Sequence, residues 1–106
     1  MLVISRFTVP EAIADAFREE LAAAHAVLAA RPGYVDGQVG RNLDDPTLWV
    51  LTTRWENVGV YRRALSSYDV KLQAVPLLSR AVDEPSAYEV VEPGTVLNTS
   101  STRSLG

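Results

Sequence analysis

The 106-residue sequence contains no cysteine and only one histidine, His25, and these two shortages exclude several kinds of chemistry. Without cysteine there is no disulfide, no thiolate nucleophile and no zinc-thiolate site. The histidine and the carboxylates do not recur at metal-ligand spacing, and there is no glycine-rich phosphate loop and no Gly-x-Ser-x-Gly stretch. The sequence therefore predicts neither a metal site nor a cofactor site.

Basic residues and long apolar runs are also scarce. A formal net charge of -3 offers no basic stripe, so we expect no nucleic-acid partner. No apolar run approaches the roughly 20 residues that a membrane helix needs, and the N-terminal residues lack the pattern of a signal peptide. With 47% hydrophobic and 22% charged residues, the sequence predicts a folded, cytoplasmic domain without a membrane partner.

Alternation and helical spacing predict the order strand, helix, strand, strand, helix, strand. This order is typical of an α+β, ferredoxin-like βαββαβ fold, an antiparallel sheet with helices on one face. We place the domain at residues 1–92 and a tail rich in serine, threonine and glycine at residues 93–106. The expected strands are Leu2–Val9, Tyr34–Asn42, Trp49 to Trp55 and Ala87–Glu92; the expected helices run from Glu11 to Arg31, from Val58, and from Tyr68 to Arg80 with an interruption at Pro76.

The stretch around the two tryptophans organises the rest of the chain. Trp49, Leu51 and Trp55 alternate along one strand face, and Asn57 is a good N-cap for the helix that follows. Tyr61 lies roughly one turn into that helix. We predict that Trp55 and Tyr61 face one cavity between the sheet and the helices; the alternative is that both simply fill the core.

A sheet with helices on one side leaves its other face uncovered. The strands that carry Tyr34, Trp49 and Leu51 have large apolar groups on both faces, so we expect a second copy of the chain to cover that face in a homodimer. The tail from Gly94 to Gly106 cannot order itself. We expect it to be held by the partner subunit or by a lattice neighbour.

Three further side chains are candidates for chemistry. His25 can act as a general base near neutral pH, although a lone histidine beside an apolar stripe is more often a hydrogen-bonded structural residue. Arg6 lies inside a strand, where it either stabilises a developing oxyanion or pairs with Asp36, Glu56 or Glu89. Tyr68 either adds a phenol to the pocket or is an exposed residue at the start of a helix.

Several short motifs resemble the antibiotic biosynthesis monooxygenase family of dimeric α+β barrels. They are Arg31-Pro32-Gly33-Tyr34, Asp44-Asp45-Pro46, Arg54-Trp55-Glu56 and Val60-Tyr61, and the likeness covers roughly Met1 to Glu92. The family includes cofactor-free oxygenases of aromatic polyketides, quinol oxygenases, haem-degrading enzymes and proteins with no assigned activity. The haem-degrading branch is less similar, because its axial histidine has no counterpart in this sequence.

In the anthrone-oxidising branch a tryptophan at the strand end and a tyrosine six residues later line the substrate pocket, and Trp55 and Tyr61 match both. The same branch has an asparagine where this chain has Leu51. The resemblance implies catalytic roles for Trp55 and Tyr61, to which the residue arguments add His25 and Arg6. Trp49, Leu51 and Tyr68 are the expected substrate-binding residues.

Two functions follow from these expectations. The first is a cofactor-independent monooxygenase that oxidises an electron-rich aromatic, such as an anthrone or hydroquinone, with dioxygen. The protein would then need to supply only a dry pocket, a base and an oxyanion stabiliser. The second is a non-catalytic dimeric barrel that binds a small apolar ligand or a protein partner. The sequence leaves open whether the chain is an enzyme.

Overall fold

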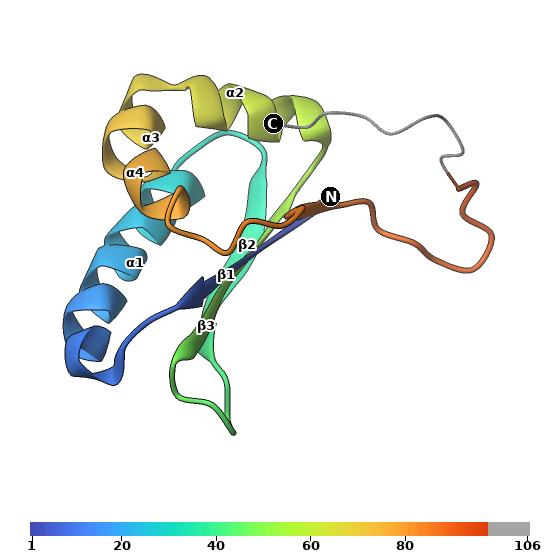
Figure 1. Cartoon of the computed structure of the whole chain (residues 1–106). Helices are drawn as coiled ribbons and strands as arrows, with labels where there is room; N and C mark the ends of the chain where they lie inside the picture. The colour runs from blue at the N-terminus through green and yellow to red at the C-terminus, as the bar shows by residue number, and fades with distance from the viewer. Residues whose placement is uncertain (98–106) are drawn as a thin grey trace.

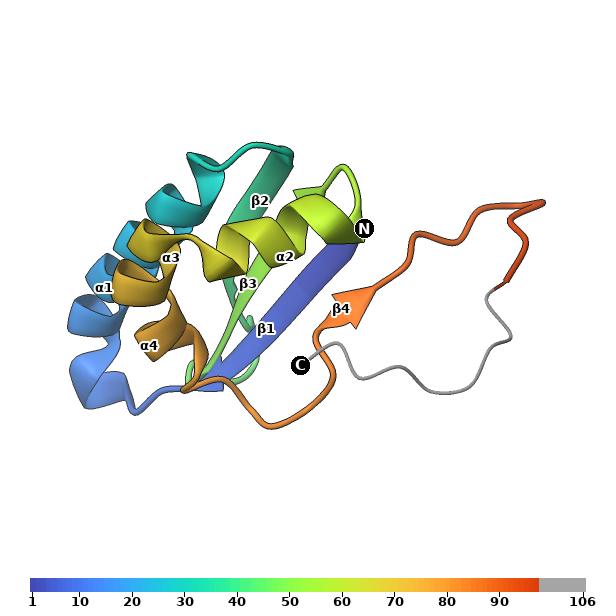
Figure 2. The ribbon, with the colours of Figure 1, turned by 90° about the horizontal axis from the view of Figure 1, so that it is seen from above.

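The computed structural model describes residues 1–97 and confirms the ferredoxin-like α+β fold (Figure 1). The sheet is antiparallel, with strand order β2-β3-β1-β4. The helices lie on one of its faces, and Figure 2 shows α2 crossing above the strands beside α3 and α4. The elements are β1 (Leu2–Thr8), a short 3-10 helix (Glu11–Ile13), α1 (Ala14–Ala29), β2 (Tyr34–Arg41), β3 (Leu48–Trp55), α2 (Val58–Ser66), α3 (Tyr68–Gln73), α4 (Val75–Leu78) and β4 (Ala87–Tyr88).

The two central strands follow the predicted alternation. β1 and β3 pair from Leu2 opposite Arg54 to Thr8 opposite Leu48. Because side chains of a strand point alternately to its two faces, every second residue meets the helices. These residues form the buried core of the sheet: Val3, Ser5 and Phe7 on β1, and Trp49, Leu51, Thr53 and Trp55 on β3.

Helix α1 supplies the opposite wall of the core. Phe17, Leu21, Ala24 and Leu28 are buried, whereas Ile13, one turn earlier, is 43% exposed and lies in the 3-10 segment. The N-cap of α2 is also confirmed, since the side chain of Asn57 accepts a hydrogen bond from the amide of Val60 at 2.9 Å. This cap sets the phase of α2 and so places Tyr61 over the sheet.

The C-terminal part differs from the expectation in two places. The last strand ends at Tyr88 rather than at Glu92, and Val90 and Val91 beyond it are exposed. A β-branched run predicts a strand, but only the first residues find a pairing partner on β1, at Leu2 and Val3. The last helical stretch is interrupted as expected, but at Ala74; Pro76 lies in the first turn of α4, where its missing amide proton costs nothing.

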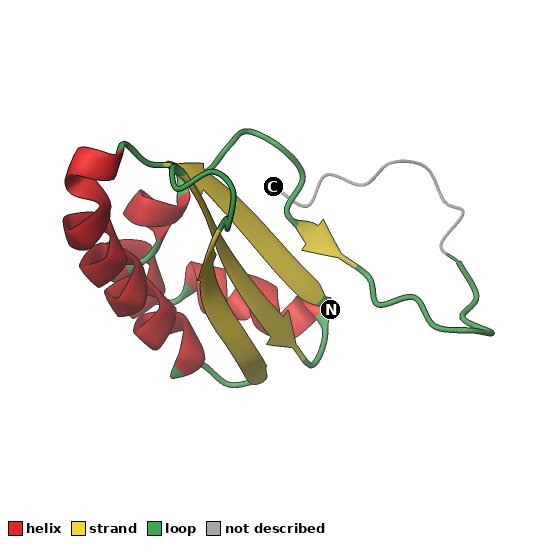
Figure 3. Ribbon diagram, turned by 90° about the horizontal axis from the view of Figure 1, so that it is seen from below, coloured by secondary structure: helices red, strands yellow, loops and turns green. Residues whose placement is uncertain are grey.

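The outer face of the sheet is not covered by any helix of residues 1–97 (Figure 3). The three large residues used to argue for a partner on this face, Tyr34, Trp49 and Leu51, all lie on the helix side instead. The outer face carries half-buried apolar side chains of β1 and β3 and the exposed Arg54–Asp36 ion pair. The homodimer therefore stays a prediction, which light scattering at micromolar concentration would test. Most of the predicted tail, residues 98–106, lies outside the described residues.

Candidate active site

A cavity of about 930 Å³ lies between β1, the helices α2 to α4, and the segment that joins α4 to β4. Its volume falls within the range of roughly 300–1,000 Å³ that is usual for small-molecule sites. The lining combines an apolar part with nine polar or charged residues. The apolar part consists of Ile4, the ring of Tyr61, Leu65, Val75, Leu78, Ala81 and Val82.

Tyr61 is the aromatic residue of this lining, and Trp55 packs against it. Their ring centroids are 5.4 Å apart at an interplanar angle of 54°. Trp55 is only 2% exposed, is not among the lining residues, and donates from its indole nitrogen to the hydroxyl of Thr53 at 2.8 Å. The two residues are therefore in contact, and of the two predicted to face one cavity only Tyr61 lines it. Burial raises the pKa of Tyr61 above its ordinary value of 10.0, which keeps the hydroxyl protonated and able to donate.

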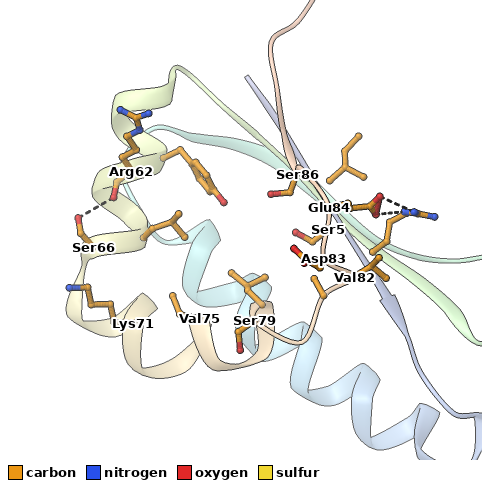
Figure 4. A pocket seen from close by; sticks show the side chains of 16 residues that line it. Ser5, Arg62, Ser66, Lys71, Val75, Ser79, Val82, Asp83, Glu84 and Ser86 are labelled. Atoms are coloured by element: carbon orange, nitrogen blue, oxygen red, sulfur yellow. Dashed lines mark hydrogen bonds and ion pairs between the residues drawn. The ribbon is translucent and has the colours of Figure 1, made fainter. Parts of the chain in front are cut away.

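The wall opposite α2 carries polar side chains. Figure 4 shows Ser5, Asp83 and Ser86 on one side of the cavity, across from Ser66 and Lys71. Ser5 comes from a helix-facing position of β1 whose neighbours on that face, Val3 and Phe7, are buried and apolar. A hydroxyl in such a position is costly unless it has a hydrogen-bond partner. The cavity gives this hydroxyl access to a bound molecule.

Arg6 lies at the rim of the same cavity, and its guanidinium is committed to a carboxylate. Its Nε and Nη2 donate to the two oxygens of Glu84 at 2.6 and 2.9 Å (Figure 4). The hydrogen bond from Arg6 lowers the pKa of Glu84, so both groups stay charged at neutral pH. The partner is none of the acids expected from the sequence, although Asp36 does pair with the other strand arginine, Arg54.

His25 lies away from the cavity and is hydrogen-bonded to Tyr34. Its Nε2 is 2.6 Å from the Tyr34 hydroxyl, and burial lowers the pKa of His25 below 6.5. This contact joins α1 to β2. The geometry matches the structural alternative for this residue, because His25 does not line the cavity.

The space for the His25–Tyr34 pair comes from Gly37. A Cβ at this position would lie 2.5 Å from the backbone oxygen of Thr52, 2.7 Å from the Tyr34 hydroxyl and 2.9 Å from Nε2 of His25. Gly37 therefore lies where the backbone of β3 and the side chains of the pair approach closely. Any larger side chain would displace the pair.

The three expected substrate-binding residues lie elsewhere. Trp49 packs edge-on against Phe17 at the other end of β3, with a centroid distance of 5.6 Å. Leu51 is 2% exposed and belongs to the core between the two tryptophans, while Tyr68 is 77% exposed at the start of α3. None of the three lines the cavity. Strand alternation correctly predicts that Trp49 and Leu51 lie on the helix-facing side of β3. That side extends beyond the cavity, so both residues pack in another part of the core.

Sequence reasoning missed the strand-side wall. Ser5 was visible as a polar residue in an otherwise apolar row, which is the signal that could have found it. Asp83 and Ser86 carry no local signal, because the path of the segment between α4 and β4 brings them to β1. That path is fixed by backbone hydrogen bonds from Val82 to Arg6 at 2.7 Å and from Ile4 to Ser86 at 2.7 Å.

Residues 1–97 offer no site of two other classes. This part of the chain holds no group of three or more histidine, cysteine or acidic side chains placed to bind a metal ion. It also has no helix with the length and apolar character needed to cross a membrane.

Solved structures with the same fold include a cofactor-independent oxygenase and proteins that are less similar in sequence. SnoaB, a cofactor-independent oxygenase from Streptomyces nogalater, is 27% identical over 85% of this chain and 94% of that chain, with a TM-score of 0.66. A protein from Deinococcus radiodurans is 20% identical over 92% of this chain and 100% of that chain, with a TM-score of 0.70, a likeness of fold. A conserved protein from Methanosarcina mazei is 20% identical over 81% of this chain and 84% of that chain, with a TM-score of 0.65.

A comparison with curated protein sequences finds no match. The model of the antibiotic biosynthesis monooxygenase family matches residues 1–72, which include β1 to β3, α1, α2, most of α3, and the Trp55–Tyr61 contact. This match covers more than half of the 106 residues and agrees with the fold. The chain belongs to the antibiotic biosynthesis monooxygenase family.

Proposed function

We propose that this protein is a cofactor-independent monooxygenase that oxidises an electron-rich aromatic of the anthrone or hydroquinone type with dioxygen. The observation that carries the proposal is the cavity of about 930 Å³ with Tyr61 in its lining. Membership of the family and the likeness to SnoaB, a cofactor-independent oxygenase, support it. The cavity is large enough for a fused-ring aromatic.

The substrate would provide the reducing power. A deprotonated anthrone is electron-rich and can pass one electron to dioxygen, after which the two radicals combine. One oxygen atom then becomes the new carbonyl and the other leaves as water, with all electrons supplied by the substrate carbon. Such a reaction needs a base, a hydrogen-bond donor for the developing oxyanion and a site that limits water.

Tyr61 is our candidate for the donor. Its raised pKa means that the phenol stays protonated near neutral pH and can donate to a substrate oxygen. Trp55 packs behind it and restricts the ring to one position over the cavity. A donor fixed in advance stabilises the oxyanion without having to reorganise during the reaction.

Asp83 is our candidate for the base. Two carboxylates line the cavity, and that of Glu84 is held by Arg6. Asp83 has no ion-pair partner among the described residues and lies on the wall across from α2 (Figure 4). The proposal therefore places the base and the donor on facing walls, with the aromatic ring of the substrate between them. In this arrangement Arg6 acts through its ion pair with Glu84, which holds the rim of the cavity in place.

The test is turnover of an anthrone or a hydroquinone under air, without added metal or flavin. Tyr61→Phe removes only the hydroxyl and should lower kcat/KM by about tenfold or more, while changing folding by less than about 1 kcal/mol. Tyr68→Phe is the matched control, because Tyr68 is 77% exposed and lies outside the cavity. Equal rates for wild type and Tyr61→Phe would remove Tyr61 from the mechanism, and Asp83→Asn tests the base in the same way.

One observation favours the second candidate, a non-catalytic barrel that binds a small apolar ligand. Leu51 stands where the anthrone-oxidising branch has an asparagine, and it is buried in the core with no polar group to offer. Binding of aromatic compounds in the cavity, combined with no oxygen consumption by wild type over a broad aromatic panel, would support this candidate instead.

A further inference from the structure

Four side chains from four different elements form a continuous column from the surface to the cavity. His25 of α1 contacts Tyr34 of β2 with a centroid distance of 5.9 Å. Tyr34 meets Trp55 of β3 edge-on at 5.4 Å, and Trp55 meets Tyr61 of α2 at 5.4 Å. The column begins at the half-buried His25 and ends in the lining of the cavity.

The middle of this column consists of the side chains that lose an electron most easily. Tyrosine and tryptophan are oxidised to radicals far more readily than phenylalanine, and their rings are in van der Waals contact along the whole column. Electron tunnelling between rings in contact is fast. The other aromatic cluster of the core, Phe7, Phe17 and Trp49, lacks tyrosine, so it contains no such series.

The outer end of the column also has a partner for the proton. A tyrosine that loses an electron must lose its phenolic proton as well, and it is oxidised more easily when a base is hydrogen-bonded to the hydroxyl. Nε2 of His25 lies 2.6 Å from that hydroxyl. In the tautomer that carries its proton on Nδ1, the imidazole accepts from Tyr34. Burial lowers the pKa of His25 and so favours the neutral, accepting form near pH 7.

We propose that His25, Tyr34, Trp55 and Tyr61 form a relay that carries single oxidising equivalents from the cavity to the surface between α1 and β2. A one-electron oxidant in the cavity, such as an oxygen-derived or substrate-derived radical, takes one electron from Trp55 through the ring of Tyr61 and is thereby reduced. Tyr34 returns that electron to Trp55 and passes its proton to His25. A soluble one-electron reductant such as ascorbate then reduces the Tyr34 radical, which takes its proton back from His25.

Such a relay would protect an oxygenase. A radical that escapes coupling with the substrate is discharged at the surface and does not modify the cavity. This role rests on the proposed function, because that function supplies the oxidant. Conduction through the column does not depend on any substrate, so it can be tested separately.

The absence of cysteine makes the test specific. Ala29→Cys places a single thiol on the exposed side of α1, one turn after His25, for attachment of a ruthenium photosensitiser. Flash oxidation of the ruthenium, followed by transient absorption, reports tyrosyl and tryptophanyl radicals. All proteins carry Tyr68→Phe and Tyr88→Phe, which removes the two exposed tyrosines. We expect both radicals in this background.

Three variants separate the relay from simple core packing. Tyr34→Phe should abolish both radical signals, Trp55→Phe should abolish the tryptophanyl signal alone, and His25→Gln should abolish or strongly slow tyrosyl formation. Trp49→Phe is the matched tryptophan control and should change nothing. Circular dichroism checks that each variant is folded, and Tyr34→Phe keeps the ring in any case.

Unchanged radical yields in Tyr34→Phe would overturn the relay, as would a tryptophanyl signal that depends on Trp49 rather than on Trp55. Absence of turnover on every aromatic substrate would overturn the proposed function but would not change the radical yields in the flash experiments. The two failures are thus distinguishable.

Discussion

The core contains two aromatic clusters on the same face of the sheet, and they differ in what surrounds each tryptophan of β3. Trp49 packs with Phe7 and Phe17, at centroid distances of 5.3 Å between the phenylalanines and 5.6 Å from Phe17 to Trp49. Trp55 packs between Tyr34 and Tyr61. The first cluster has no hydroxyl, whereas the second has a polar group at every ring.

The hydrogen bonding of the two tryptophans follows the same division. The indole nitrogen of Trp55 donates to Thr53 at 2.8 Å. That of Trp49 is buried and has no partner within residues 1–97, and its ring is covered by the guanidinium of Arg41 at 5.4 Å. A tryptophan on a strand is therefore no signal of a site by itself. Its neighbours decide whether it fills space or positions a polar group.

The largest effect should come from the phenylalanine cluster. Phe17 is 1% exposed, so Phe17→Ala leaves a cavity in the core, and we expect a loss of about 3–5 kcal/mol in the free energy of unfolding. Urea denaturation with a fitted m-value measures this. Tyr34→Phe, which changes the other cluster by one hydroxyl, should cost far less. Similar losses in the two variants would contradict the division into a packing cluster and a polar one.

The next prediction compares two glycines of β2. Gly37→Ala forces a Cβ within 2.5 Å of a backbone oxygen and into the His25–Tyr34 pair, and should cost about 1–3 kcal/mol. Gly40→Ala brings a Cβ to 3.1 Å from a methyl group of Val50, which a small shift relieves, and it restricts the unfolded chain. We expect its net effect on stability to be within about 0.5 kcal/mol. Equal costs in urea denaturation would mean that the pair is not packed against Gly37.

A third change tests the anchor of Trp55. Thr53→Val keeps the shape of the side chain but leaves the buried indole N–H without its acceptor, so we expect a loss of about 1–2 kcal/mol. Thr52→Val, on the outer face of the same strand, is the matched control and should stay within about 0.5 kcal/mol. If both variants unfold at the same urea concentration, the hydrogen bond does not stabilise Trp55.

The comparison also explains which parts the sequence could predict. Alternation in β1 and β3, helical spacing over α1 and the cap at Asn57 are local patterns, and each predicted its element correctly. The contact of Trp55 with Tyr61 followed from the same patterns, because the phase of α2 is set by its cap. Local rules therefore gave the fold and one side of the site.

The rest depends on contacts between segments that lie far apart in the sequence. Trp49 and Trp55 look equivalent along β3, and only the packing of α1 and β2 against them separates a phenylalanine environment from a tyrosine one. The strand-side wall needs the segment after α4 to return to β1, which no local pattern encodes. The partner of Arg6 was missed for this reason, since Glu84 is 78 residues away in the chain.

The smallest expected effect is a pH dependence that belongs to His25. Burial holds the pKa of His25 below the value of 6.5 expected for the unfolded chain, so the unfolded state takes up a proton first as the pH falls. Stability from the neutral histidine is therefore present above about pH 6.5 and is lost as the pH drops through that value toward the lower pKa of the folded state. The carboxylates of Asp36 and Glu84 also have lowered pKa values, but their ordinary pKa values are 3.8 and 4.5, so they change the stability only in more acidic solution.

The urea concentration at the unfolding midpoint of wild type should decrease as the pH is lowered from about 7.5 to about 5.5. His25→Gln cannot titrate and retains an amide for Tyr34, so its midpoint should change less over the same interval. Parallel curves for the two proteins would show that the polar cluster does not sense pH, and would leave the His25–Tyr34 contact as packing alone.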